Sequence, residues 1–162
     1  MSKRVAYYGI FASLAILMGY VEAMIPLPLP PGIKLGLSNV VVVLCMYIMD
    51  LKSAFFISII RIFISALLFK GFVSMWYSLA GAVLSFMVMA VLFKSKGVSI
   101  IGVSALGGVF HNIGQVIVAA ILLGRNIVIY LLPLLMISGV VTGVLIGIVS
   151  RYTVSYLQNR NL

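Results

Sequence analysis

Six long apolar runs, separated by short connections, dominate the 162-residue sequence. A helix needs about 20 apolar residues to cross the hydrocarbon core of a bilayer, and most of the runs approach or exceed that length. Because the bilayer core offers no water to backbone polar groups, such runs must be helices. The sequence therefore predicts an all-α integral membrane bundle of about six transmembrane helices, forming a single domain over residues 1–162. The predicted spans are residues 5–25, 37–49, 53–69, 72–93, 98–123 and 127–150.

The composition also favours a membrane protein. Only 8% of the residues are charged and 64% are apolar, whereas about a quarter of the residues in a soluble domain are charged. The net charge of +9 comes from cations scattered between the apolar runs, and nucleic-acid binding would need a clustered basic patch. We therefore expect the lipid bilayer, with its anionic headgroups, as the partner of these cations, and no nucleic acid.

The first apolar run has one alternative interpretation. Lys3 and Arg4 before an apolar segment are typical of a secretory signal peptide. No convincing small-x-small cleavage site follows, and the apolar run continues past Gly19. We therefore interpret residues 5–25 as the first transmembrane helix.

The distribution of lysine and arginine predicts the orientation of the bundle. Seven of these residues lie in one set of alternate connections and three in the other, and Arg61 lies inside a span. Because cytoplasmic loops are enriched in lysine and arginine, both termini are predicted to be cytoplasmic and the proline-rich connection at 26–34 to face outward. The cytoplasmic set is Lys3, Arg4, Lys52, Lys94, Lys96, Arg151 and Arg160, and the outer set is Lys34, Lys70 and Arg125.

Two stripes of small residues, each at a spacing of four, predict close helix packing. The stripes are Gly139, Gly143 and Gly147 in the last span, and Ala15, Gly19 and Ala23 in the first. Packing inside the bundle and docking of another membrane subunit both fit such stripes. The sequence alone does not separate the two interpretations.

Polar side chains at membrane depth are costly, so each is a candidate functional residue. His111, Asn112 and Gln115 are spaced to share one broad helix face. We predict that they line a polar cavity in the outer half of the bilayer, and an interhelical hydrogen-bond network is the alternative. Arg61 lies roughly 12 Å inside its span. It is expected either to tie helices together through backbone carbonyls or to provide the counter-charge for an anionic ligand.

Two further candidates, Lys34 and Asn39, flank the start of the second span, where free N–H groups favour anions. Glu22 is expected to pair with Lys34 or another outer cation. The basic and amide groups favour a small-molecule ligand with an anionic part, which could be attached to an apolar or aromatic body. The candidate substrate-binding residues are thus His111, Asn112, Gln115, Asn39, Lys34 and Arg61.

Metal binding is not expected. His111 is the only histidine, and Cys45, Glu22 and Asp50 have no ligand spacing with it. No cofactor and no catalytic residue are predicted.

Two motifs resemble a known family. The run I-P-L-P-L-P-P-G-I-K-L-G-L-S-N at residues 25–39, with Arg61 and H-N-I-G-Q at 111–115, is similar to the Gx transporter group, whose members are also labelled heptaprenyl diphosphate synthase component I. The group is similar to the substrate-binding (S) components of energy-coupling-factor (ECF) vitamin transporters. That likeness implies six helices, cytoplasmic termini, and an outward pocket capped by the connection between the first two helices. It also implies a membrane coupling subunit with ATPases, docked on the first helix, where Gly19 departs from the usual alanine pair.

The resemblance implies a substrate-binding subunit of a vitamin- or precursor-type uptake transporter in the bacterial plasma membrane, dependent on partner subunits for energy. Prenyl chain elongation is not expected, because it needs clustered aspartates to hold Mg²⁺ and Asp50 is the only aspartate. The chain has no Gly-rich Walker loop, so ATP hydrolysis would come from a partner. The alternatives are a non-catalytic membrane accessory component of polyprenyl diphosphate or quinone metabolism, and a purely structural membrane subunit.

Overall fold

The computed structural model describes residues 2–25, 36–95, 97–123 and 125–159. Within these residues it is helical, with no strand, which confirms the predicted all-α bundle. Five helices are long and apolar enough to cross a membrane, and α2 is a shorter apolar helix. The elements are α1 (Ser2–Met24), α2 (Leu37–Ile48), α3 (Leu51–Ser65), the π-helical turn η1 (Ala66–Lys70), α4 (Gly71–Lys94), α5 (Ile100–Leu123) and α6 (Arg125–Asn159).

The proline-rich connection at 26–34, predicted to be a lid, lies outside the described residues. Lys34, a candidate binding residue, lies within it. Lys96 and Arg160, which contributed to the predicted orientation, also lie outside the described residues.

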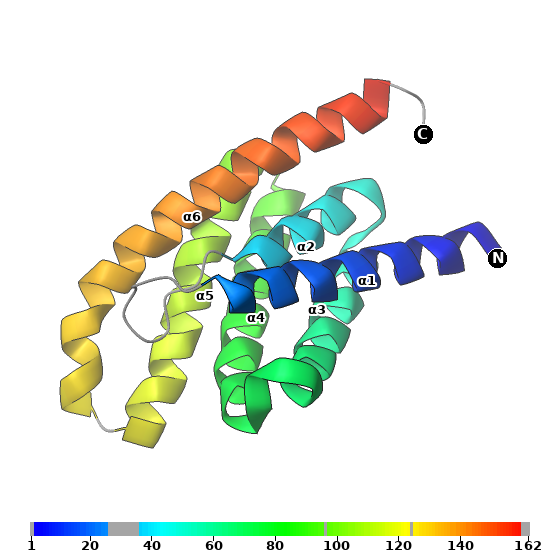
Figure 1. The fold of residues 1–162 in the computed structure, drawn as a ribbon. Coiled ribbons are helices and arrows are strands. Elements are labelled where there is room, and N and C mark those ends of the chain that lie inside the picture. Colours follow the sequence, from blue (N-terminus) through cyan, green and yellow to red (C-terminus); the bar gives the residue numbers. More distant parts are fainter. Residues whose placement is uncertain (1, 26–35, 96, 124, 160–162) are drawn as a thin grey trace.

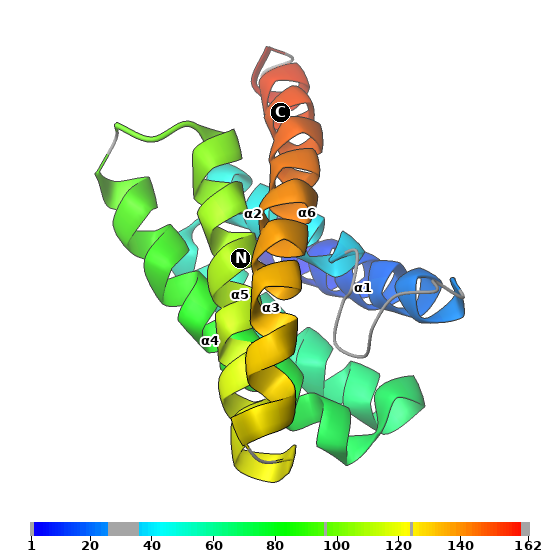
Figure 2. The ribbon, with the colours of Figure 1, turned by 90° about the vertical axis from the view of Figure 1, so that its left-hand side faces the viewer.

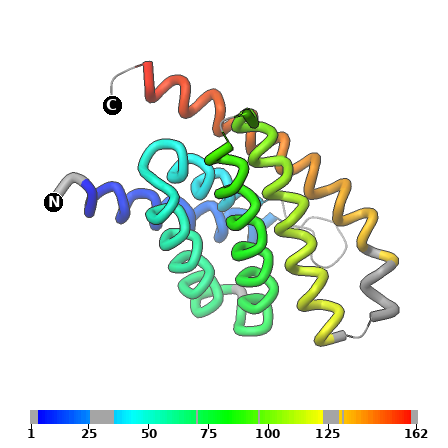
Figure 3. The backbone as a smooth tube through the Cα atoms, turned by 180° about the vertical axis from the view of Figure 1, so that it is seen from behind, coloured from blue at the N-terminus to red at the C-terminus, as the bar shows by residue number. Residues whose placement is uncertain are grey.

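The helices form two groups that meet at the centre of the bundle. Helices α4, α5 and α6 lie side by side, and α1 crosses α2 and α3 on the other side of the molecule (Figures 1 and 2). The two termini lie on the same side as the α2–α3 turn, away from the turn that joins α5 to α6 (Figures 1 and 3). This arrangement agrees with two termini on one side of a membrane.

The short helix α2 lies in the core of the bundle. Six consecutive residues, Val41–Met46, are buried. A helix that is apolar on all sides is typically buried on all sides, and beyond Ser38 and Asn39 in its first turn α2 is apolar on every face. Because neighbouring helices surround it, α2 does not need the length of a lipid-exposed span.

The glycine stripe of α6 packs inside the bundle, against α5. A β-carbon added to Gly143 would lie 2.6 Å from the carbonyl oxygen of Ser104, and one added to Gly147 would lie 2.6 Å from the Cα atom of Ile101. Such a separation is far below van der Waals contact, so the two backbones approach closely only because these positions lack side chains. Of the two interpretations of this stripe, internal packing is the one observed.

The small residues of α1 do not form one face. Ala15 and Gly19 are buried, whereas Ala23 is exposed. A spacing of four advances by about 40° around a helix with 3.6 residues per turn, so the two steps from Ala15 to Ala23 turn by about 80° and leave the original face. Only the first part of this stripe packs into the bundle.

The last span is longer than predicted, whereas the third span ends close to the predicted residue 69. Helix α6 contains Pro133 and continues to Asn159, beyond the predicted end at residue 150. In this part of α6, Ser150 and Val154 are buried while Arg151 is exposed. The inner face of the helix therefore still packs on the bundle after its outer face has become polar. The third span ends in η1, and Gly71 follows with a positive φ of 75°. Glycine adopts this conformation without the steric cost that a β-carbon would add.

Candidate functional site

A polar cavity of about 40 Å³ lies where the six helices meet. Its volume is enough for about three water molecules. Val43 and Ile146 are among the few apolar residues in its wall, and every helix contributes at least one polar side chain. The polar wall residues are Glu22, Ser38, Asn39, Arg61, Ser78, Ser85, Ser104, His111, Asn112 and Thr142.

Arg61 connects α3 to the start of α2. Its side chain is buried, with 8% exposed. The Nη1 atom donates a hydrogen bond to the hydroxyl of Ser38, and Nη2 donates to Oδ1 of Asn39 at 2.7 Å. The Nε atom is buried and has no hydrogen-bond partner among the described residues. Arg61 therefore ties two helices together through side chains and also forms part of the cavity wall.

Glu22, near the end of α1, contacts the residue that precedes α2. Glu22 is also 8% exposed, and its carboxylate accepts a hydrogen bond from the backbone N–H of Gly36. Gly36 has a φ of 73° and accepts a hydrogen bond from the N–H of Asn39 through its carbonyl, at 2.7 Å. This positive φ requires glycine in most sequences. The end of α1 is thereby fixed to the start of α2, and the expected pairing of Glu22 with Lys34 lies outside the described residues.

His111 and Asn112 reach the cavity from α5. The Nδ2 atom of Asn112 donates to the carbonyl of Leu135 at 2.5 Å and lies 3.3 Å from the hydroxyl of Ser138. Asn112 therefore also ties α5 to α6. A β-carbon on Gly81 of α4 would lie 2.9 Å from Cε1 of His111, so the imidazole occupies space that Gly81 leaves free.

Gln115 lies one helical turn beyond His111 and outside the cavity wall. It is buried, and its Nε2 atom lies 3.3 Å from Nε2 of His111. The structure thus brings Asn39, Arg61, His111 and Asn112 together around one cavity. Gln115 contacts that group from outside the wall.

Sequence reasoning missed several residues of the wall. Glu22 was expected to pair with an outer cation, yet it is one of only two acidic residues and lies within a span, which is a usable signal. The hydroxyls of α4, α5 and α6 carry no comparable signal. Serine and threonine in helices commonly bond to their own backbone, as Thr142 does to the carbonyl of Ser138 at 2.8 Å.

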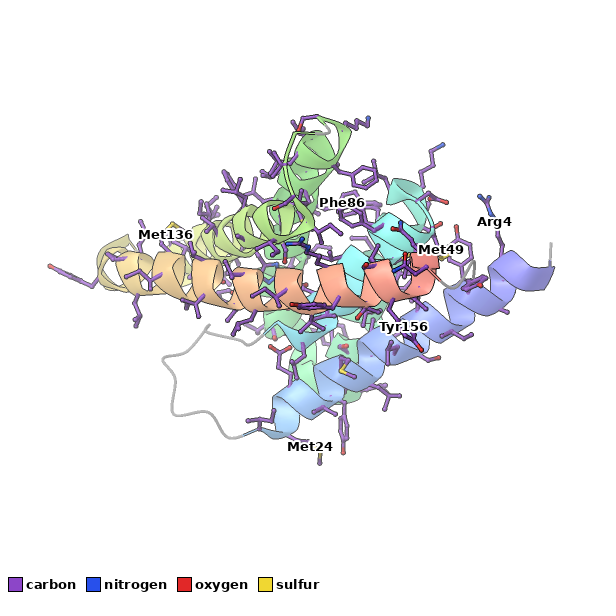
Figure 4. All side chains as sticks on the ribbon, turned by 90° about the horizontal axis from the view of Figure 1, so that it is seen from above. Arg4, Met24, Met49, Phe86, Met136 and Tyr156 are labelled. Atoms are coloured by element: carbon purple, nitrogen blue, oxygen red, sulfur yellow. The ribbon has the colours of Figure 1, made fainter. Side chains whose placement is uncertain are left out.

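A second polar contact lies away from the cavity, at the end of the molecule that holds the N-terminus. Asp50 precedes α3, and its Oδ1 atom accepts a hydrogen bond from the N–H of Ser53 at 2.7 Å. Its Oδ2 atom lies 3.8 Å from Nη2 of Arg4. Figure 4 shows Arg4 and Met49, the residue before Asp50, at the same end of the molecule. The pKa of the Asp50 carboxyl is lowered, chiefly by the hydrogen bond from Ser53 and less by Arg4. This contact caps a helix and connects it to α1.

The apolar helices and the polar cavity at their centre define an integral membrane protein with an internal polar site. The family model of heptaprenyl diphosphate synthase component I matches residues 11–153, so the chain belongs to that family, as the two motifs indicated. The matched segment contains every residue of the cavity wall. No curated protein and no solved structure matches the chain.

Proposed function

We propose that this protein is the membrane-embedded substrate-binding subunit of a small-molecule uptake transporter, and that the central cavity is its binding site. The observation that supports this proposal is the convergence of polar side chains from six helices on one cavity inside an apolar bundle. Polar groups inside a membrane bundle are costly and are typical of substrate and ion sites. A concave site with several convergent polar groups is also the usual form of a small-molecule site.

Helix ties alone account for only part of this wall. Among the wall residues, Glu22, Arg61 and Asn112 make hydrogen bonds that tie helices together. The same cavity is also lined by Ser78 and Ser85 of α4 and by Ser104 of α5. A purely structural core would be expected to fill this position with apolar side chains, because polar groups add stability there only when fully satisfied.

The proposed transporter needs partners. Residues 26–34 would act as the lid, and the energy for transport would come from a membrane coupling subunit with ATPases. This part of the proposal rests on the likeness to S components of energy-coupling-factor transporters. The proposed location is the bacterial plasma membrane.

The proposal is tested by identifying small molecules that remain bound through purification in mild detergent, using mass spectrometry. Ser78→Leu would fill the cavity, since Ser78 is half-buried in its wall. Ser155→Leu is the matched control, because Ser155 is exposed on α6 and remote from the wall. A bound molecule should be present in the wild type and in Ser155→Leu. It should be lost in Ser78→Leu, while that variant still unfolds in a single cooperative transition like the wild type. The absence of any molecule with this pattern would refute the proposal.

The family name supports a second candidate function, a non-catalytic accessory component of polyprenyl diphosphate synthesis. In that case the protein would associate with a catalytic prenyl synthase and change its product yield or membrane location. Pull-down from the native membrane separates the two functions. Recovery of a prenyl synthase without ATPases would favour the accessory function, and recovery of ATPases would favour transport.

A further inference from the structure

Two opposite charges lie in the wall of the central cavity. Glu22 and Arg61 are the charged lining residues in the part of the chain that the structure describes, leaving aside the imidazole of His111. Each is only 8% exposed. A buried charge is strongly destabilising unless another charge or several hydrogen bonds compensate it. The wall thus carries one negative and one positive group with no net charge.

The two charges do not form a direct ion pair. Among the described residues, Arg4 and Asp50 are the one pair of oppositely charged side chains within 4.0 Å of each other. Glu22 instead accepts a hydrogen bond from Gly36, and Arg61 donates to Ser38 and Asn39. Neutral partners therefore hold each charge at a fixed place in the wall of the same cavity.

From this arrangement we infer that the cavity binds a small zwitterion, with its anionic group at Arg61 and its cationic group at Glu22. The inference rests on the proposed function. Arg61 retains donor capacity, because its Nε atom has no partner within the described residues. Charge-assisted hydrogen bonds are stronger than neutral ones, so a ligand with one anionic and one cationic group can bind both buried groups at once.

Other ligand classes fit this wall less well. A simple anion would add a net negative charge to a buried site that already contains Glu22, and a simple cation would add a net positive charge beside Arg61. Charges in a low-dielectric site interact more strongly than in water, so either addition is disfavoured. The described wall contains no Phe, Tyr or Trp side chain, and the imidazole of His111 is its one aromatic ring.

The size of the cavity limits the ligand further. A volume of about 40 Å³ holds only about three water molecules. The ligand is therefore expected to be no larger than the smallest amino acids, and wall side chains must move to admit one. The hydroxyl and amide groups around the two charges can bind the polar parts of such a molecule, and apolar side chains such as Val43, Met89 and Ile146 line the rest of the cavity.

The inference is tested by ligand-induced thermal stabilisation of the full chain in nanodiscs. Glycine, β-alanine and γ-aminobutyrate are the zwitterionic probes. Acetate, propionate and butyrate are the matched anions, and methylamine, ethylamine and propylamine are the matched cations. A ligand that binds only the folded state raises its Tm by an amount that increases with the ratio of ligand concentration to Kd. At least one zwitterion should bind with an affinity about tenfold or more above its matched anion and cation, because each charged contact contributes that much.

Variants assign the two charges. Glu22→Gln keeps an oxygen that can accept from Gly36 but removes the negative charge, so it should lower zwitterion affinity about tenfold or more and raise the relative affinity for the matched anion. Arg61→Gln should shift the preference toward the matched cation. Arg61→Lys keeps the charge and should keep the preference for the zwitterion, and it is the second variant if Arg61→Gln fails to fold. Asp50→Asn is the control, since it removes a carboxylate outside the cavity.

Equal binding of anion and zwitterion, an unchanged ratio in Glu22→Gln, or no binding by any probe would overturn the inference. A co-purified molecule that is lost in Ser78→Leu but is not a zwitterion would also refute it, while leaving the proposed function intact. If no such molecule is present in any preparation, the proposed function itself fails.

Discussion

The Nη2 atom of Arg61 in α3 donates a hydrogen bond of 2.7 Å to the Oδ1 atom of Asn39 in the first turn of α2. The neighbouring Nη1 atom donates to Ser38. The start of α2 is thus held from two directions, by Arg61 on one side and by the Glu22–Gly36 hydrogen bond on the other. Both contacts come from residues of the cavity wall, so the position of α2 and the shape of the cavity depend on each other.

Replacing Asn39 tests the contact with Arg61. Asn39→Leu removes the acceptor and leaves a buried guanidinium nitrogen without a partner, which should lower the free energy of unfolding by about 1–3 kcal/mol. Asn39→Asp keeps an acceptor of similar size and should lose much less stability. Unfolding by SDS titration in mixed micelles measures both. Equal destabilisation by the two variants would contradict this explanation.

Gly36 is predicted to be sensitive to any β-carbon. Its φ of 73° lies in the left-handed region, and an added Cβ would lie 3.2 Å from Cδ1 of Ile146. Gly36→Ala should therefore destabilise the protein by about 1 kcal/mol or more.

The matched control for this prediction is Gly9→Ala in α1. Gly9 is exposed, and a β-carbon there would meet nothing within 4 Å. Alanine is favoured over glycine inside a helix by up to about 1 kcal/mol, so this variant should be neutral or stabilised. A similar loss of stability in both variants would show that the left-handed conformation of Gly36 is not the cause.

The sequence was sufficient to predict the helical bundle because long apolar runs leave few alternatives. It also singled out Arg61, His111 and Asn112, since ionisable and amide groups are rare at membrane depth. The end of α6 was less predictable. Hydropathy marks the part of a helix that contacts lipid, whereas α6 continues to Asn159 with Val154 still packed on the core.

The other residues of the cavity wall could not be predicted, because the rotation of each of the six helices about its axis decides which side chains line the cavity. Gln115 and Asn112 share a helix face, yet only Asn112 reaches the cavity. Ser78, Ser85 and Ser104 look like ordinary helix residues in the sequence. Only the packing of α4 against α5, with glycines at the crossing such as Gly81 and Gly114, places these hydroxyls in one wall.

Asp50 predicts a pH dependence of stability. The pKa of its carboxyl is lowered from the ordinary value of 3.8, first by the hydrogen bond from Ser53. A carboxyl whose pKa is lower in the folded state stabilises that state above the unfolded pKa, and this contribution is lost as the pH falls through the folded pKa. The wild type should therefore lose stability below about pH 4, and Asp50→Asn should lack that component.

Asp50 also caps α3 through its hydrogen bond with Ser53. Two substitutions distinguish the effect of this hydrogen bond from the effect of the charge. Asp50→Ala should lower the free energy of unfolding by about 1 kcal/mol at neutral pH, while Asp50→Asn should retain most of the capping. Unfolding titrations of the three proteins between pH 3 and pH 7 measure both effects. An acid-dependent loss of the same size in Asp50→Asn would assign it to another group.

The orientation of the bundle is tested by cysteine labelling in intact cells. The excess of lysine and arginine on one side predicts that position 34 is external and that position 96 is cytoplasmic. Lys34→Cys should react with an impermeant maleimide, and Lys96→Cys should react only after the membrane is opened. The native Cys45 is buried and should react slowly. The opposite labelling pattern would invert the topology.

Asn112 and Gln115 offer the sharpest separation of binding from packing. Asn112 lines the cavity and also donates to the carbonyl of Leu135, so Asn112→Ala should lower both the retention of the bound molecule and the free energy of unfolding, the latter by about 1–3 kcal/mol. Gln115 contacts His111 from outside the wall, so Gln115→Ala should reduce stability by about 1 kcal/mol with a smaller effect on retention. Mass spectrometry of the purified variants and SDS unfolding provide the two quantities on the same samples. If Asn112→Ala loses stability but keeps the full amount of bound molecule, Asn112 is a helix tie and not part of the binding site.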